Sequence, residues 1–265
     1  MLQAELPSAG TPPLRIPEDL DSEWTVIVFS QPPPWNSKRD DGLPPSPARF
    51  LQSLAEFAGS RPSKDVKVML ATFGGDAGTT GEQLVSGKTK LDFPVFTVPG
   101  GADNPLVRRL GILSEDKELN SVLLHKDGRV AVMVSGLANQ GSRNGGTIAN
   151  VITREDEKTV AAMLERGDIE KAKSLILSLA PPFDPEAVDE RGRKPKPPQY
   201  SLSHLRARAR VYMALKEWDK ALADAEEVVQ RQLGTDGGMS LRTDELDESE
   251  ALRGSILELQ AKSKE

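Results

Sequence analysis

Two arginines placed one helical turn apart are the side chains of this sequence best suited to binding chemistry. Residues 203–215 are expected to form a helix, which puts Arg206 and Arg210 on the same face. A guanidinium donates paired, charge-assisted hydrogen bonds to a carboxylate, which makes arginine suitable for binding acidic groups. The alternative is that both arginines pair with Glu226, Glu227 or the acidic last helix, as solvated ion pairs that contribute little.

Redox and metal chemistry have little basis in the sequence. The 265 residues include no cysteine, which excludes thiol–disulfide exchange and peroxidatic cysteine chemistry. The two histidines, His125 and His204, lie far apart, and neither has a histidine or cysteine at ligand spacing. His125 is expected to be a hydrogen-bonded surface residue at a strand end. The sequence therefore predicts no metal site and no cofactor, and it contains no Gly-x-Ser-x-Gly nucleophile motif.

One segment partly matches a phosphate-binding loop. In Ser86-Gly87-Lys88-Thr89 the spacing to the preceding Gly81 is one residue too long, and the segment leads into an expected strand, not a helix. The glycines of 74–81 do follow an expected strand, which leaves a backbone anion site as an alternative to a plain loop. Neighbouring acid pairs such as Asp40-Asp41 are interpreted as solvated charges.

Composition limits the function classes. The formal net charge is −6 and the sequence pI is near 5.2, which argues against nucleic-acid binding. No uncharged apolar run approaches the ~18 residues of a membrane span, so a soluble protein without membrane insertion is expected. Residues 1–7 have no basic or apolar signal region. Two compartments stay open: the cytosol, or an extracytoplasmic space if Met1 replaces a removed signal peptide.

Period-two and helical patterns alternate in the first half of the chain. Residues 1–23 are interpreted as an extended lead-in that packs along the surface. Asp127-Gly128 between two apolar runs is a strong signal for a β-hairpin. The expected elements are strands at 24–30, 66–73 and 93–98, helices at 48–58 and 104–110, and hairpin strands at 120–125 and 129–135.

This order of elements resembles the thioredoxin fold, in particular the alkyl hydroperoxide reductase and thiol-specific antioxidant branch. The resemblance covers residues 24 to about 137, roughly half of the chain, and implies an α/β domain over 24–150. Its hairpin stretch is the more specific part. The matching stretches are Val26–Phe29, Val66–Phe73, Phe93–Phe96 and Ser121–Val130.

Two landmarks of that family are missing. The family carries a cysteine after the first strand, whereas Trp35 here is followed by Asn36-Ser-Lys-Arg39. The family also carries a cis-proline where this chain has Leu119-Asn120. The resemblance therefore implies a pseudo-enzyme. The alternative is an enzyme of a non-thiol class with its site at the C-terminal strand ends, lined by Trp35, Asn36, Arg39 and the 74–81 loop.

The second half is predicted to be helical. Residues 138–150, rich in glycine and asparagine, are expected to be a loop, and Thr153–Asp156 is expected to cap the first helix. Two helix–turn–helix units follow, with alanines 172 and 221 at matching places. The last helix, Leu246–Leu259, is expected to close the array.

These units resemble tetratricopeptide repeats. The second is the better match, through Ala209, Tyr212, Trp218, Asp219 and Ala221. The spacing of 49 residues exceeds the family's ~34 because of a Pro- and Lys-rich insertion at 181–198. The resemblance implies that 151–265 is a repeat domain whose concave groove is lined by the face that carries Arg206 and Arg210. In some members of that family basic residues of the groove hold acidic peptides or a C-terminal carboxylate, so the resemblance also implies a protein or acidic peptide partner.

The sequence as a whole predicts a non-catalytic interaction or scaffold protein. A thioredoxin-like domain without cysteines would be fused to a partner-binding helical domain. Within the second repeat, Ala209, Tyr212 and Ala221 are expected to face the core, and both arginines are expected to be exposed.

Overall fold

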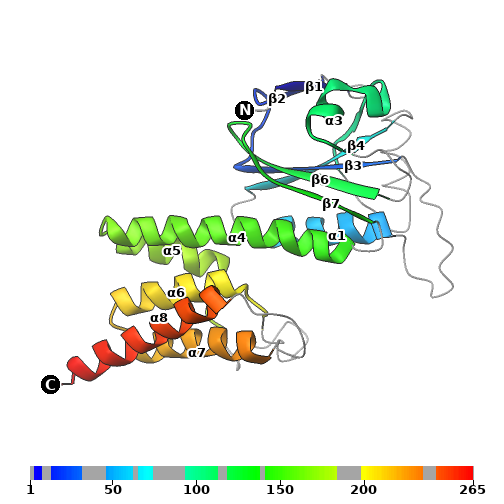
Figure 1. The fold of residues 1–265 in the computed structure, drawn as a ribbon. Coiled ribbons are helices and arrows are strands. Elements are labelled where there is room, and N and C mark those ends of the chain that lie inside the picture. The colour runs from blue at the N-terminus through cyan, green and yellow to red at the C-terminus, as the bar shows by residue number, and fades with distance from the viewer. Residues whose placement is uncertain are drawn as a thin grey trace, which may run out of the picture. The chain divides into compact units, whose positions relative to one another are not determined.

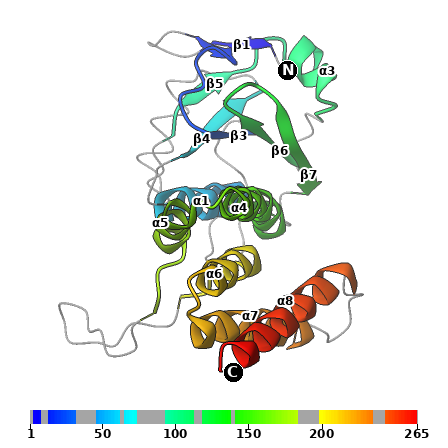
Figure 2. The ribbon, with the colours of Figure 1, turned by 90° about the vertical axis from the view of Figure 1, so that its left-hand side faces the viewer.

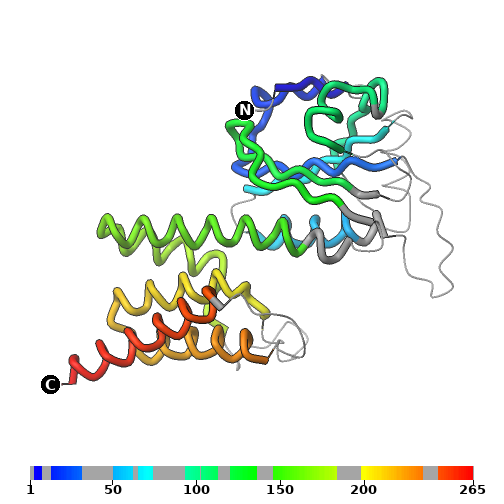
Figure 3. The backbone as a smooth tube through the Cα atoms, viewed as in Figure 1, coloured from blue at the N-terminus to red at the C-terminus, as the bar shows by residue number. Residues whose placement is uncertain are grey.

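The structure is a computed structural model of the 265-residue chain. It describes residues 3–7, 13–31, 46–61, 65–73, 93–112, 118–137, 141–183, 198–234 and 243–264 (Figure 3). The chain divides into two compact units, Met1–Val151 and Ile152–Glu265. No helix within the described ranges is long and apolar enough to cross a bilayer.

The first unit is built on a five-stranded sheet of order β5-β4-β3-β6-β7 (Figure 1). The strands β3, β4 and β5 run parallel, whereas β6 is antiparallel to β3 and β7 is antiparallel to β6. The bounds are β3 Trp24–Ser30, β4 Val66–Thr72, β5 Val95–Thr97, β6 Glu118–His125 and β7 Val130–Leu137.

Helices α1 (Ser46–Ser60) and α3 (Pro105–Arg109) of this unit stand where the sequence predicts them. Helix α1 joins β3 to β4, and α3 precedes β6. In the β6–β7 turn, Gly128 has a φ of 77°, the left-handed conformation that a tight hairpin requires. A βαβ unit followed by an antiparallel hairpin on the other side of its first strand is the thioredoxin-like topology, so the predicted thioredoxin-like α/β fold is confirmed.

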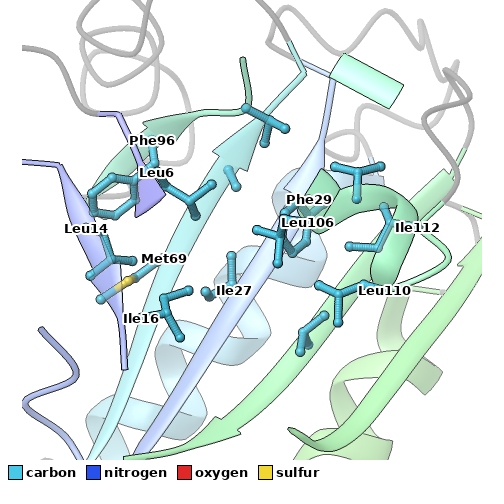
Figure 4. Close-up of a cluster of buried hydrophobic side chains, with 14 of the residues drawn as sticks. Leu6, Leu14, Ile16, Ile27, Phe29, Met69, Phe96, Leu106, Leu110 and Ile112 are labelled. Carbon is cyan, nitrogen blue, oxygen red and sulfur yellow. The ribbon is translucent and has the colours of Figure 1, made fainter. Parts of the chain in front are cut away.

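The N-terminal lead-in belongs to the core and does not merely pack along the surface. It forms an antiparallel pair, β1 (Ala4–Leu6) and β2 (Leu14–Ile16). Leu6 and Ile16 are 0% and 1% exposed and lie over the sheet beside Phe96 and Met69 (Figure 4). The expectation of a surface segment is wrong because alternate residues of these short strands are apolar and cover an otherwise open face of the sheet.

Residues 141–150 form a helix where a loop is predicted. Helix α4 (Gly141–Glu165) runs through this segment, so residues 153–156 lie inside it and do not cap its start. Each glycine costs about 1 kcal/mol in a helix. Ile148 and Ile152, one turn apart, are both fully buried. Burying two such side chains offsets part of that cost. The loop prediction is wrong because local propensity does not include this burial.

The second unit repeats one helix–turn–helix arrangement. The amide of Asp168 donates to the carbonyl of Met163, and the amide of Glu217 donates to that of Tyr212, both at 2.9 Å. Left-handed residues stand at the same place in both turns, Gly167 with a φ of 78° and Lys216 with a φ of 61°. The helices are α5 Ile169–Leu179, α6 Leu202–Ala214, α7 Trp218–Gly234 and α8 Thr243–Lys262.

Helix α6 lies between α5 on one side and the pair α7 and α8 on the other (Figure 2). It contributes to two hydrophobic clusters of described residues. Ala207 and Val211 pack with residues of α4 and α5, whereas Ala209 and Tyr212 pack with residues of α7 and α8. Ala209, Tyr212 and Ala221 are buried, as expected. Helix α6 is therefore covered on two sides, although its sequence is rich in charge.

The role of the lead-in can be tested at two neighbouring residues of β2. Replacing Ile16 with alanine leaves a cavity in the core and should lower the free energy of unfolding by about 2–5 kcal/mol. The control is Arg15→Ala, because the Arg15 side chain is 61% exposed; it should change the free energy by about 0.5 kcal/mol or less. Urea unfolding of the intact chain measures both. Equal effects would contradict a core role for β2.

Candidate functional site

The carboxyl ends of the parallel strands carry buried hydroxyl groups. Ser30 and Thr72 are register partners at the ends of β3 and β4. The hydroxyl of Ser30 donates to the carbonyl of Gln31 at 3.0 Å, and that of Thr72 donates to the carbonyl of Phe96 at 3.4 Å. A nucleophilic hydroxyl instead needs a base at its proton. These contacts are therefore structural ones.

The other residues predicted to line this end of the sheet are not described. Trp35, Asn36, Arg39 and the 74–81 loop lie outside the described residues. Asn120 lies in β6 and is 1% exposed. Its neighbour Ser121 is 2% exposed.

His125 is the last residue of β6 and lies between two carboxylates. Its Nε2 is 2.7 Å from Glu23 Oε1, and its Nδ1 is 3.0 Å from Asp127 Oδ1. The ring also meets Trp24 edge to face at a centroid distance of 5.3 Å. Among the residues described, no group of three or more His, Asp or Glu side chains is arranged to hold a metal ion. The contacts of His125 tie the hairpin turn to the start of β3.

The acids beside His125 are held in their ionised form. The backbone amide of Arg129 is the main cause that lowers the pKa of Asp127 to about 2, and the side chains of His125 and Arg129 add to it. The hydrogen bond from Lys126 is the main cause that lowers the pKa of Glu23. The hairpin turn is therefore a cluster of paired charges near the surface.

The two arginines predicted to bind a partner share one carboxylate of α4. Arg206 donates from Nε and Nη2 to the two oxygens of Glu157, at 2.9 and 2.8 Å. Arg210 donates from Nη1 to the same carboxylate at 2.8 Å. The side chain of Arg206 is only 6% exposed, against 30% for Arg210. The expected exposure is therefore wrong for Arg206, and Glu157 takes the place of the glutamates expected as partners.

The intervening arginine was not singled out from the sequence, yet it makes the larger set of contacts. Arg208 donates to both oxygens of Asp224 in α7, at 2.7 and 2.6 Å. Its Nη1 donates to the carbonyls of Ala180 and Pro181, and its guanidinium lies over the ring of Tyr200. Arg208 thus joins the end of α5 and the start of α6 to α7.

Burial and pairing act in opposite directions on these arginines. Burial lowers the pKa of Arg206, but the hydrogen bonds and charge of Glu157 outweigh it, so the pKa lies above the usual guanidinium value. Burial and Asp224 act on the pKa of Arg208 in the same way, with the same net rise. His204, also buried, lies 2.9 Å from Asp156 of α4 through its Nε2. Arg206, Arg208 and Arg210 of α6 are therefore each paired with a carboxylate of the same unit.

Comparison with known proteins gives structural likeness alone. No protein-family model matches the chain, and no curated protein matches it. A thiol-disulfide oxidoreductase from Bacteroides fragilis is 14% identical over 54% of this chain and 95% of its own, with a TM-score of 0.38. A putative thiol:disulfide interchange protein DsbE from Chlorobium tepidum is 15% identical over 57% and 93%, with a TM-score of 0.41.

Peroxiredoxins are also among the similar structures. Peroxiredoxin Q from Xanthomonas campestris is 13% identical over 55% of this chain and 89% of its own, with a TM-score of 0.38. At these identities and TM-scores the likeness carries no argument about activity. The fold assignment rests on the strand order and connections described above.

The shared carboxylate can be tested by removing its charge. Glu157→Gln leaves two arginines without their counter-charge, one of them buried, and should lower the free energy of unfolding by about 3–5 kcal/mol. The control is Glu155→Gln two residues earlier, which breaks only the exposed pair with Lys158 and should cost about 1 kcal/mol or less. Urea unfolding of both variants is the measurement. Similar midpoints would show that Glu157 is not needed for folding.

The hairpin turn should make stability depend on acid. The pKa of Asp127 in the folded chain, about 2, lies below the value of about 3.9 in an unfolded chain. Its contribution to stability is therefore complete above about pH 4 and is lost as the pH falls towards 2. Asp127→Asn removes this contribution, so the melting temperatures of wild type and variant should converge between pH 4 and pH 2. Curves that stay parallel would contradict the assignment.

Proposed function

We propose that the protein is a non-catalytic interaction protein, in which a thioredoxin-like domain without thiol chemistry accompanies a partner-binding helical domain. The observation that carries this proposal is the combination of a thioredoxin-like topology with a sequence that has no cysteine. The strand-end hydroxyls of Ser30 and Thr72 support it, because they donate to main-chain carbonyls.

The second unit is proposed to be a tetratricopeptide-like repeat pair. Support comes from the two turns with matching hydrogen bonds, and from the fully buried alanines 172 and 221 at the same place after each turn. Repeats of this kind stack helix pairs and leave an extended surface for a partner. The second unit is therefore the proposed interaction domain.

Arg210 is proposed to be the contact for an acidic partner. Arg206 is engaged with Glu157 and buried, whereas Arg210 uses Nη1 for Glu157 and its side chain is 30% exposed. Reversing both charges would break the buried pair and disturb folding, so binding must be tested at Arg210 alone. A partner of matching chemistry is a protein or peptide rich in carboxylates.

The absence of thiol chemistry gives the first test. Purified protein should reduce neither insulin disulfides nor hydrogen peroxide above a buffer control, because it has no thiol to carry the electrons. Turbidity and peroxide-consumption assays measure this. Peroxide turnover that co-purifies with the chain through several columns would overturn the non-catalytic proposal.

The second test uses a hexaglutamate peptide and fluorescence anisotropy. Arg210→Gln removes one charge-assisted contact and should weaken binding by about tenfold to a hundredfold. The control is Arg166→Gln, which removes the same charge from an exposed arginine in the α4–α5 turn and should bind as wild type does. Equal affinity of the two variants would remove Arg210 from the proposed site.

A further inference from the structure

Three arginines of α4 and α6 lie around two carboxylates. Glu157 accepts from Arg206 and Arg210, as described above. Arg154, one turn before Glu157 on α4, contacts Glu245 in the first turn of α8. Arg154, Arg206 and Arg210 are therefore each paired with a carboxylate of α4 or α8.

One guanidinium nitrogen of this group lacks a hydrogen-bond partner among the described residues. Nη1 of Arg206 is buried and has no hydrogen-bond partner among the described residues, although Nε and Nη2 are both bonded. A buried N–H that bonds to nothing costs free energy, and this cost is greater for a charged group. An additional carboxylate oxygen at this position would remove that cost.

The start of α8 brings carboxylates to this place. Glu245 contacts Arg154, which lies one turn before Glu157 on α4. After burial, which acts the other way, and after Glu157, the charges of Glu245 and Glu248 also raise the pKa of Arg206. The chain's own acids thus occupy the surroundings of the arginines, but without a hydrogen bond to Nη1 of Arg206.

The start of α8 buries none of its described side chains. The buried residues of α8 are Ser249, Leu252 and Ile256, all from its second turn onwards. Before Ser249, no α8 residue with a described side chain is buried, and the contact with Arg154 joins groups that are 44% and 31% exposed. Salt and competing carboxylates weaken contacts of this kind more than they weaken apolar burial. The first turns can therefore separate while Leu252 and Ile256 hold the rest of the helix.

We propose that the first turns of α8, residues 243–248, are an autoinhibitory segment that covers the arginines of α4 and α6 until an acidic peptide displaces it. The inference rests on the proposed function, because it takes the same acidic class of partner. It adds a regulated state: opening of α8 releases Arg154 from Glu245, and the buried Arg206 becomes available only then. The apparent affinity of the peptide is then reduced by the fraction of molecules that are closed.

The test compares two double variants of the full chain. Glu245→Gln/Glu248→Gln removes the acids near Arg154 and Arg206. Asp247→Asn/Glu250→Gln removes the same charge from exposed positions of the same turns and so controls for the effect of acids on the helix N-terminus. The first pair should increase hydrogen exchange at amides 246–250 and phenylglyoxal modification of Arg206 by about tenfold over the second pair. Binding of hexaglutamate should tighten by about tenfold as well.

The outcomes separate the two proposals. Faster exchange and modification together with tighter peptide binding support the autoinhibitory segment. Opening without tighter binding also supports the segment but removes the acidic-peptide function. No difference between the two double variants in exchange or modification overturns the segment. Arg154→Gln breaks the same contact from α4 and should open α8 alike, which keeps the test decisive if either double variant folds poorly.

Discussion

The second unit depends on burying a helix whose every second residue carries a charge or an imidazole. From His204 to Arg210 the even positions of α6 are polar and ionisable, while alanines and other apolar residues stand between them. A buried charge without a partner destabilises a fold far more than a lost surface contact does. Helix α6 can therefore lie between its neighbours only where each of these groups meets an acid. Asp156 and Glu157 on α4 and Asp224 on α7 meet that requirement.

This requirement also fixes the register of the helices. Sliding α6 along α4 by one turn would separate Arg206 from Glu157, and sliding it along α7 would separate Arg208 from Asp224. The alanines of α6 do not specify register themselves, because a small side chain fits beside many neighbours. Buried ion pairs add little net stability, yet they can select one arrangement among several apolar ones. We infer that this selection is the role of the alternating Arg-Ala sequence.

Local signals predicted most of the elements but not the partners of α6. The Asp127-Gly128 turn and the alanines 172 and 221 act within a few residues, so their structures follow from the sequence. The pairing of Arg206 with Glu157 spans 49 residues, and helical periodicity gives a face but not the helix that covers it. The predictions for the lead-in and for the start of α4 were wrong for a similar reason. Leu6, Ile16 and Ile148 gain from burial against distant residues, which local propensity does not contain.

The partners that polar groups already have limit where a binding or catalytic site can lie. In the first unit, the buried hydroxyls of Ser30 and Thr72 donate to main-chain carbonyls, and His125 lies between two carboxylates. In the second unit, Arg208 is engaged on every side. Groups committed in this way hold the fold and are not free to bind. What distinguishes the arginines around Glu157 is that Nη1 of Arg206 has no acceptor among the described residues. The start of α8 supplies acids nearby but does not make that hydrogen bond. A partner whose carboxylate accepts from Nη1 would therefore gain binding free energy by replacing α8.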